Sequence, residues 1–305
     1  MEPMWWGEHE CSMCAKKAYF TVGDSLRCGA HSNTSSFRRE LPKNPLVVKM
    51  KDGNLDTHNA SIEAAAAANR ALNKRGTVSV GKYGRGRAMA LVAGVRNVFP
   101  NNRHQNRVDG FGCASLSPMQ LGPVRHGQPG VPDALSIENY YQFNKVFESE
   151  LAGVTTKGQR DIMGVFYERR NKAYLDPVPH RHKFPPTFKR NGKREVPVFS
   201  LHLDSRGGER RCSYLQSRYY YCHQYELLAK QTADFATLRN WLAQGYNLQI
   251  LGFDGYPITK TMWEHYNDTN KPFGHELALY ALLLIENADD YPWNKYYRAN
   301  RAFYD

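Results

Sequence analysis

The sequence has no long apolar run and few cysteines for its length. Its longest apolar stretch, residues 277–285, suits a core helix and is far shorter than the roughly 20 residues that a membrane-spanning helix needs. Six cysteines in 305 residues do not form the dense framework of a small secreted disulfide protein, so we expect a reducing compartment. The acidic first ten residues, with Trp5 and Trp6, are unlike a secretory signal. These absences predict no membrane partner and a cytoplasmic location.

A phosphate-binding loop is absent as well, because residues 81–87 lack the spacing and the Lys-Ser/Thr ending of that motif. The sequence does have the composition of a folded protein, with 41% hydrophobic residues, 19 Tyr, 14 Phe and 5 Trp. Apolar periodicity predicts strands and helices in mixed order, which indicates an α/β or α+β fold with one main core. The expected strands cover residues 76–81, 196–203 and 248–253, and the expected helices cover residues 59–73, 137–147, 159–174, 214–230, 234–244 and 275–286.

Four residues near the start have the spacing of zinc ligands. Cys11 and Cys14 form a C-x-x-C pair, and Cys28 and His31 form a C-x-x-H pair after a gap of thirteen residues. Each pair bends the chain so that two ligands point to one tetrahedral site. Four protein ligands leave no open coordination position, so this pattern predicts a structural zinc ion. A module of roughly 25 residues has too small a core to fold alone, and the metal would supply that stability.

Positive charge is concentrated directly after this module. The chain has a net charge of +12, and residues 32–108 contain 14 Lys and Arg against 4 Asp and Glu. Such a segment attracts phosphate backbones, so nucleic acid is a candidate partner, although a solvated surface would have the same composition. We therefore divide the chain into a zinc module with its linker (residues 1–45), a basic segment (46–108) and a main domain (109–305).

The helix expected over residues 137–147 carries three functional side chains at one spacing. Ser136 is suited to cap it, and Glu138, Gln142 and Lys145 fall at positions i, i+4 and i+7. They would share one helical face. The simplest structural reading is a pair of exposed charges, Glu138 and Lys145, linked through Gln142.

This segment, with two later ones, resembles the NADAR superfamily of N-glycosidase-type domains over about residues 113–286. The similar segments are residues 135–145, with the glutamate, aromatic, glutamine and lysine pattern, residues 235–254, with a glycine-ended helix and an acid-ended strand, and residues 273–277. Asn139 stands where that family has histidine, and only Trp263 corresponds to its tryptophan-glycine stretch. The resemblance implies a NADAR-like main domain and hydrolysis of a nucleotide-like or ADP-ribose-like substrate.

Cleavage of a C–N glycosidic bond builds positive charge on the sugar, and a carboxylate beside the anomeric carbon stabilises that charge. Glu138 is the first candidate for this role. Asp254, at the end of a strand, is the second candidate, although Asp before Gly is common in simple turns. The candidate substrate-binding residues are Lys145, Arg169 and Arg170 for a phosphate, Gln142 beside them, and Tyr141 and Trp263 for stacking on a base.

The whole chain also resembles an uncharacterised group of proteins from large DNA viruses that joins a similar zinc module to such a domain. This second resemblance implies the host cytoplasm or a virion as the setting, with other virion proteins as further candidate partners. The alternative to an enzyme is therefore a virion, minor capsid or nucleic-acid-binding protein that keeps the fold without the chemistry. The basic segment and the abundant tyrosines motivate this alternative.

Overall fold

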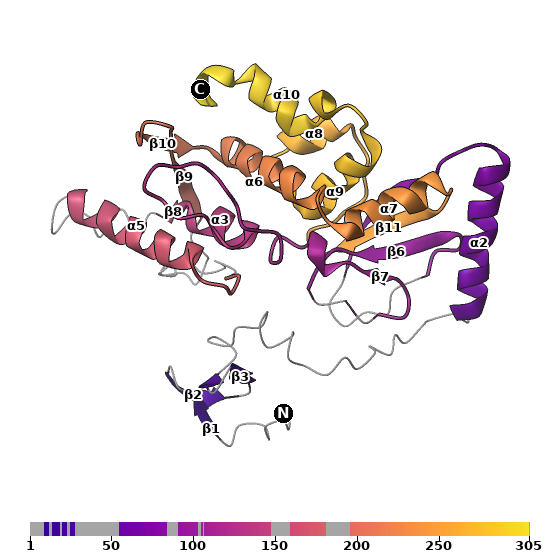
Figure 1. The fold of residues 1–305 in the computed structure, drawn as a ribbon, viewed down its shortest axis with the longest axis horizontal. Coiled ribbons are helices and arrows are strands. Elements are labelled where there is room, and N and C mark those ends of the chain that lie inside the picture. The colour runs from indigo at the N-terminus through magenta and orange to yellow at the C-terminus, as the bar shows by residue number, and fades with distance from the viewer. Residues whose placement is uncertain are drawn as a thin grey trace.

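The computed structural model describes residues 9–11, 14–18, 20–22, 25–27, 55–83, 91–102, 105, 107–147, 159–180 and 196–304. Side chains are described from residue 55 onward, apart from those of residues 159–165. The fold is mixed α/β, with one parallel and one antiparallel sheet beside a group of helices (Figure 1). This confirms the predicted fold class.

The parallel sheet joins segments that are far apart in the sequence. Its order is β5-β11-β6-β7, and all three pairings are parallel. The strands are β5 (Val78–Lys82), β6 (Val95–Phe99), β7 (Phe111–Gly112) and β11 (Asn247–Gly252). Because β5 and β6 flank β11, the described part of the basic segment shares its sheet with the main domain. The boundary at residue 108 does not separate two bodies.

The antiparallel sheet has the order β10-β9-β8. Its strands are β8 (Lys145–Phe147), β9 (Pro197–Leu203) and β10 (Glu209–Cys212), and Lys145 pairs with Ser200. Two helices lie beside this sheet, α3 (Ile137–Phe143) and α5 (Gln159–Tyr174) (Figure 1). The bounds of α5 are those that the sequence predicted.

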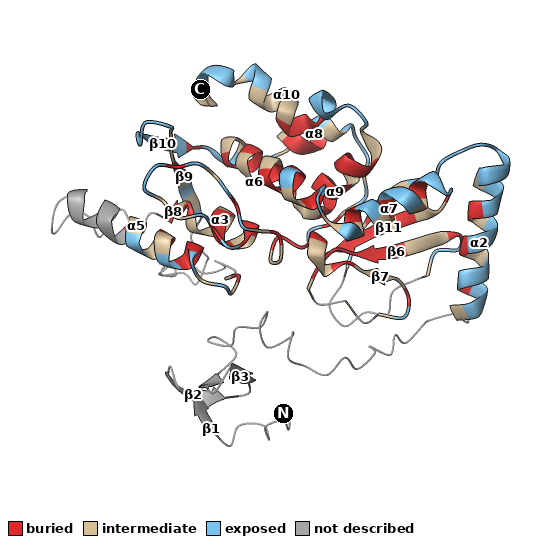
Figure 2. Cartoon of the chain, viewed as in Figure 1, coloured by how far each residue is buried: buried red, intermediate tan, exposed pale blue. Residues whose placement is uncertain are grey.

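The helix α6 (Tyr214–Ala229) contacts β9 and β10 and packs against both α3 and α9 (His275–Leu284). Burial is densest along α6, α9 and β11 (Figure 2). The remaining helical elements are η1 (Ala114–Leu116), α7 (Ala233–Ala243), α8 (Met262–Asn267), η3 (Ala288–Asp290), α10 (Pro292–Ala299) and α11 (Arg301–Tyr304). Gly245 follows α7 with φ +88°, the left-handed conformation of the predicted glycine C-cap. Among the described residues, no helix combines the length and the apolar character needed to cross a membrane.

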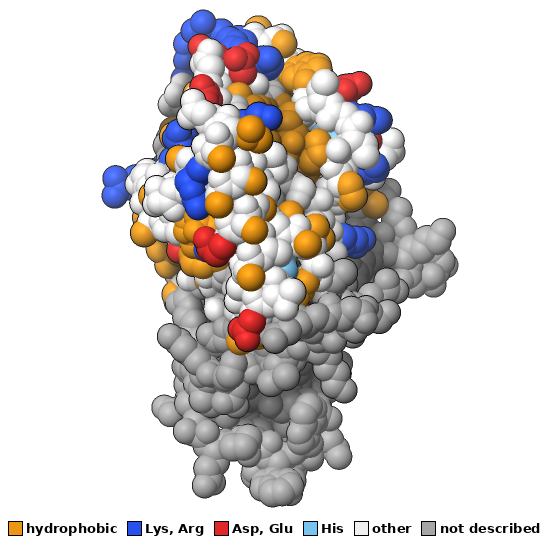
Figure 3. Space-filling view, turned by 90° about the vertical axis from the view of Figure 1, so that its right-hand side faces the viewer, with side chains coloured by type: hydrophobic (Ala, Val, Ile, Leu, Met, Phe, Trp, Pro, Cys, Tyr) orange, Lys and Arg blue, Asp and Glu red, His pale blue; other side chains and the backbone are white. Residues whose placement is uncertain are grey.

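The helix α2 (Leu55–Ala71) begins earlier than the sequence predicted. Ser61 therefore lies inside the helix, where its hydroxyl donates to His58 O (2.6 Å) and accepts from Gly94 N (2.9 Å). Of the five alanines at residues 64–68, only Ala66 is buried, so the run contributes helix propensity more than close packing. Figure 3 views the molecule from this side, and apolar side chains there are scattered among uncharged ones.

The four strands near the N-terminus form two antiparallel pairs. They are β1 (His9–Cys11), β2 (Cys14–Ala18), β3 (Phe20–Val22) and β4 (Ser25–Arg27). β1 pairs with β2, and β3 pairs with β4. This part of the chain is described by its backbone alone.

Candidate functional site

The helix α3 carries the main candidate residues, and it is shorter than predicted. Ser136 caps it as expected, because its hydroxyl accepts from Asn139 N (3.2 Å). The helix ends at Phe143 instead of residue 147, and Lys145 begins β8. Pairing with β9 replaces the last helical turn, since Leu201 N donates to Asn144 O (2.7 Å). The prediction that Lys145 lies on the helix was therefore wrong.

Lys145 nevertheless reaches the predicted partners. Its ammonium donates to Gln142 Oε1 (2.8 Å), and Gln142 Nε2 donates to Glu138 Oε1 (3.2 Å). The same ammonium lies 4.3 Å from the centre of the Tyr141 ring. Burial lowers the pKa of Lys145 to about 8, and the charge of Glu138 opposes part of this shift. A cation and a carboxylate are thus linked by one amide in a half-buried position.

Tyr221 of α6 lies against this group. Its ring centre is 4.9 Å from that of Tyr141. Burial raises the pKa of Tyr221 well above its ordinary value, and the charges of Tyr225, Glu276 and Glu138 raise it further. Two carboxylates from different helices, Glu138 on α3 and Glu276 on α9, therefore act on one tyrosine.

Glu276 is buried, with 1% of its surface exposed. It is the second residue of α9 after the N-cap Gly274, and its carboxylate rests on Gly252 at the end of β11. A Cβ atom added to Gly252 would lie 1.7 Å from Glu276 Oε1. No side-chain or backbone donor among the described residues forms a hydrogen bond with Glu276 Oε2.

The neighbouring His275 contacts this oxygen. Its Nε2 lies 2.7 Å from Pro100 O, and a carbonyl only accepts, so Nε2 carries the hydrogen. Its Nδ1 lies 3.3 Å from Glu276 Oε2 and forms an ion pair with it when the ring is protonated.

Asp254, the second predicted carboxylate, is exposed just beyond the end of β11. Its Cβ lies 3.6 Å from the position that a Cβ at Gly274 would take. Asp254 is therefore close to the start of α9 and on the solvent side of Glu276. Chain order alone pointed to Asp254, whereas the buried acid at this sheet end is Glu276.

The predicted phosphate-binding arginines are placed elsewhere. Arg170 is 1% exposed, and its guanidinium lies 4.8 Å from the Tyr167 ring centre, with Phe166 and Tyr174 beyond it. Burial lowers the pKa of Arg170. Aromatic rings therefore enclose this guanidinium, and its part in holding a substrate phosphate stays a prediction. Arg169 is half-buried, with its guanidinium 5.6 Å from the Phe166 ring centre.

Trp263 lies on α8 with 41% of its surface exposed. Its carbonyl accepts from Asn267 Nδ2 (2.8 Å). Within the described part of the chain, no recorded contact joins Trp263 to Glu138, Tyr141 or Lys145. The structure thus brings together Glu138, Tyr141, Gln142 and Lys145.

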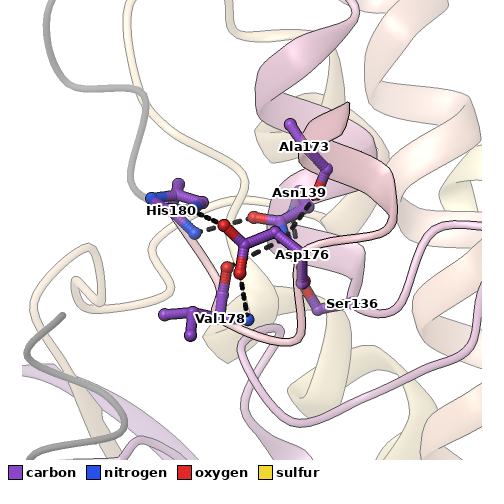
Figure 4. Close-up of polar contacts among 6 residues, drawn as sticks. All are labelled: Ser136, Asn139, Ala173, Asp176, Val178 and His180. Carbon is purple, nitrogen blue, oxygen red and sulfur yellow. Dashed lines mark hydrogen bonds and ion pairs between the residues drawn. The ribbon is translucent and has the colours of Figure 1, made fainter. Parts of the chain in front are cut away.

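Asn139, beside Glu138, fastens α3 to the segment after α5 (Figure 4). Its amide nitrogen lies 2.9–3.1 Å from the carbonyl oxygens of Ala173, Asp176 and Val178. Its amide oxygen accepts from His180 N (2.7 Å). Asn139 is fully buried and committed to the backbone, so this position fixes the helix and presents no polar group to a ligand.

Sequence reasoning missed Glu276 and Tyr221 as site residues. One signal was present, because Glu276 is the only acid in an otherwise largely apolar helix, HELALYALLL. An acidic residue on such an apolar helix is rarely buried without a reason. Tyr221 had no comparable signal, since it is one of several tyrosines on α6.

An open groove with a volume of about 450 Å³ lies elsewhere. None of the predicted catalytic or substrate-binding residues lines it. Its lining comes from η1, the loop before α3 and the end of α6, namely Ala114, Ser115, Gln120, Leu121, Gly122, Leu228, Gln231 and Thr232.

The described arginines of the basic segment have partners within the protein. Arg70 donates to Gln244 O, Arg75 donates to Leu283 O, Arg96 lies over the Trp241 ring, and Arg107 pairs with the buried Asp109. Contacts within the protein therefore account for much of the positive charge in the described part of the basic segment. Residues 84–87, with two further arginines of the basic segment, lie outside the described residues.

Cys11 and Cys14 face each other as Cα partners at one end of the β1–β2 hairpin. β4 ends at Arg27, directly before Cys28 in the sequence. This backbone suits the first C-x-x-C pair of a zinc site. Cys28 and His31 lie outside the described residues. In the rest of the described chain, no three His, Cys, Asp or Glu side chains gather as metal ligands.

Comparison with known proteins gives no relative: no family model, no curated protein and no solved structure matches the chain.

Proposed function

We propose that the protein is an N-glycosidase-like hydrolase that acts on a nucleotide-like or ADP-ribose-like substrate. One observation carries the proposal, the polar chain from Lys145 through Gln142 to Glu138 beside Tyr141 and Tyr221. It combines an anion, a cation and aromatic surface, which are the groups that a phosphorylated N-glycoside requires. The NADAR-like pattern of residues 135–145 supports the same assignment.

In the proposed reaction, water attacks the anomeric carbon and the C–N bond breaks. The Glu138 carboxylate stabilises the positive charge that develops on the sugar and accepts a proton from the attacking water. The bonding electrons pass to the departing nitrogen, which takes up a proton from solvent. Lys145 pairs with a substrate phosphate, and the half-buried position strengthens that pairing.

The test compares wild-type protein with a Glu138→Gln variant on a panel of nucleotides and ADP-ribosylated nucleosides. Mass spectrometry would follow the release of a free base or of ADP-ribose. We expect release by the wild type and a loss of roughly 10²- to 10⁴-fold in the variant. Glu264→Gln is the matched control, because Glu264 is exposed and caps α8, and glutamine can replace glutamate in a capping box.

Equal release by the wild type and Glu138→Gln would contradict the proposal, as would no release from any member of the panel. In the second case, a salt-dependent affinity for DNA or RNA that Glu138→Gln leaves unchanged would favour the virion or nucleic-acid-binding alternative.

We also propose that Cys11, Cys14, Cys28 and His31 hold a structural zinc ion. The pairing of Cys11 with Cys14 across the β1–β2 hairpin supports it. Protein purified without added zinc should contain about one equivalent of the metal, and Cys14→Ser should lose most of it. A content well below one equivalent in the wild type would contradict the proposal.

A further inference from the structure

The open groove beside α6 is built from two segments that lie far apart in the sequence. One wall comes from η1 and the loop that follows it, and the other comes from the junction between α6 and α7. Its volume of about 450 Å³ is in the range of ligand pockets. Every described residue that lines it is uncharged, so the lining offers no oppositely charged partner to a phosphate or to a cation.

Two polar side chains of the lining offer hydrogen-bond acceptors. The Ser115 hydroxyl donates its hydrogen to Asp234 Oδ2, because a carboxylate only accepts, and the Ser115 oxygen then has only lone pairs for another partner. Gln231 Nε2 donates to Leu227 O (2.8 Å), so the other end of this amide, Oε1, is an acceptor. The Thr232 hydroxyl is committed to capping α7. A ligand that pairs with Ser115 and Gln231 must therefore bring hydrogen-bond donors.

Apolar side chains complete the walls of the groove. Leu121 is 4% exposed, and Leu228 is half-buried near the end of α6. These leucines give a flat ring an apolar surface to pack against. A nucleobase with an exocyclic amino group combines such a ring with two N–H donors. Adenine and cytosine carry this amino group, whereas hypoxanthine and uracil carry a carbonyl, an acceptor, at the same position.

The groove borders the start of α3, the helix that carries Glu138. The loop that lines the groove is fastened to this helix by two backbone hydrogen bonds. Leu121 O accepts from Ile137 N (2.9 Å), and Pro118 O accepts from Glu138 N (3.0 Å). The groove and the first turn of α3 are therefore neighbours.

The helix α6 connects the groove to the aromatic pair beside Glu138. Tyr221 contacts Tyr141 with ring centres 4.9 Å apart, and Leu228 follows Tyr221 by seven residues on the same helix. Seven residues make almost two helical turns, so Tyr221 and Leu228 lie on one face of α6. At roughly 1.5 Å per residue they are about 10 Å apart along the helix axis, a length that one nucleotide can span.

We propose that the groove binds an amino-bearing nucleobase, with the Ser115 oxygen and Gln231 Oε1 accepting from its exocyclic amino group. This inference rests on the proposed function for the class of ligand, and it names the base as adenine or cytosine and not hypoxanthine or uracil. The uncharged groove suits the base, whereas the cation Lys145 suits the phosphate of the same ligand.

The experiment measures nucleoside binding in a Glu138→Gln background, where a bound ligand is not consumed. A nucleoside has no phosphate, so the measurement does not depend on Lys145. Titration calorimetry would compare adenosine with inosine and cytidine with uridine. We expect the amino-bearing member of each pair to bind roughly tenfold more tightly, because the carbonyl of its counterpart would face acceptors. Ser115→Ala and Gln231→Ala should each reduce this ratio to about threefold or less.

Ser205→Ala is the matched control, because Ser205 is exposed in the turn between β9 and β10, and it should keep the full ratio. Circular dichroism and the unfolding midpoint of each variant establish that the protein is folded. Gln231 is exposed, so Gln231→Ala tests the inference even if the loss of the Ser115 hydroxyl destabilises the protein. Photo-crosslinking with 8-azidoadenosine should label peptides that contain residues 114–122 or 228–232.

Equal affinities within both nucleoside pairs would overturn the inference, as would a ratio that neither variant lowers, labelling confined to other peptides, or no binding of any nucleoside at millimolar concentration. Displacement of adenosine by agmatine, a guanidinium compound without a ring, would also overturn it, because the groove would then select charge. The proposed function is judged separately by product release from the wild type. Release without the base preference leaves only the function standing, and the preference without release leaves only the base site.

Discussion

The two faces of α3 use polar side chains in different ways. On one face Asn139 meets four backbone groups of the segment after α5 (Figure 4), and Tyr140 is buried among His126, Tyr174 and His202. On the other face, Gln142 bonds to Glu138 and to Lys145 at the start of β8, and all three side chains stay half-buried. We refer to them as the anchored face and the relay face.

This difference between the faces shows which polar side chains are able to bind a ligand. A side chain that satisfies the backbone cannot leave without orphaning buried groups, which costs more than the bond itself contributes. A side chain that bonds to another side chain near solvent can exchange that partner at little cost. Adjacent residues such as Glu138 and Asn139 therefore have opposite roles.

The largest effect is expected from Asn139→Ala on the anchored face. It would remove the amide N–H groups that three carbonyls share and the acceptor of the His180 N–H, and we expect a loss of about 3–5 kcal/mol in the free energy of unfolding. Urea denaturation measures it. Glu138→Ala, at the next position on the relay face, is the control and should cost less than about 1 kcal/mol. Similar losses in the two variants would remove the distinction between the faces.

Acid pH should also lower the stability of the protein, through a buried histidine beside the anchored face. Burial lowers the pKa of His202 to about 3, and the charges of Arg170 and His126 contribute. Between the unfolded value of about 6.5 and this folded value, the unfolded chain binds a proton that the folded chain does not. Stability therefore falls as the pH falls, by about 1.4 kcal/mol per pH unit for this residue, or about 2 kcal/mol between pH 6.5 and 5.

His202→Phe should flatten the dependence of unfolding free energy on pH by this amount, because the variant has no group to titrate there. The buried ring stacks on Tyr220 with centres 4.1 Å apart, and phenylalanine can keep that packing. An unchanged slope in denaturation curves at pH 6.5, 6 and 5 would show that His202 is not held neutral by the fold.

The sequence predicted much of the secondary structure, because local signals set it. The bounds of α5 were predicted to the residue, and α6, α7, α9, β9 and β11 differ by only one or two residues at most ends. The errors occur where contacts with residues far away in the sequence determine the secondary structure. α3 ends early because β8 pairs with β9, which follows some fifty residues later.

The candidate site was predicted in part for the same reason. Glu138, Gln142 and Lys145 are close in sequence, and a helical period was enough to group them even though Lys145 is on a strand. Glu276 comes from the other end of the domain, and only the packing of α6 against α9 brings it near Tyr221. Arg170 is of a residue type that binds phosphate, and its enclosure by aromatic rings could not be predicted from the sequence.

At the relay face, ligand affinity should depend on pH in the alkaline range. Burial lowers the pKa of Lys145 to about 8, so the ammonium is complete below this value and is lost as the pH rises through it. If Lys145 holds a phosphate, the affinity for AMP should fall about tenfold per pH unit above pH 8, or about 1.4 kcal/mol. In Lys145→Arg the cation persists, since a guanidinium stays charged, and the affinity should not change between pH 7 and 9.5.

Direct titration of Lys145 tests whether its own loss of a proton causes the weaker binding of AMP at alkaline pH. The ¹³Cε resonance of Lys145, assigned by its loss in Lys145→Arg, should shift with a midpoint near pH 8. A midpoint near 10.5, the ordinary value, would mean that the amine is solvated and would remove the pH argument for phosphate binding.

The smallest effect is expected from Gln142→Ala. Gln142 joins Lys145 to Glu138 by two side-chain hydrogen bonds, and such pairs on a helix surface contribute only a few tenths of a kcal/mol. Tyr174→Phe is the matched control on the anchored face. It removes one buried hydrogen bond, to Asn144 Oδ1 (2.9 Å), and should cost about 1 kcal/mol. If Gln142→Ala proved the more damaging of the two in urea denaturation, the relay would be part of the scaffold, and its side chains could not exchange partners with a substrate.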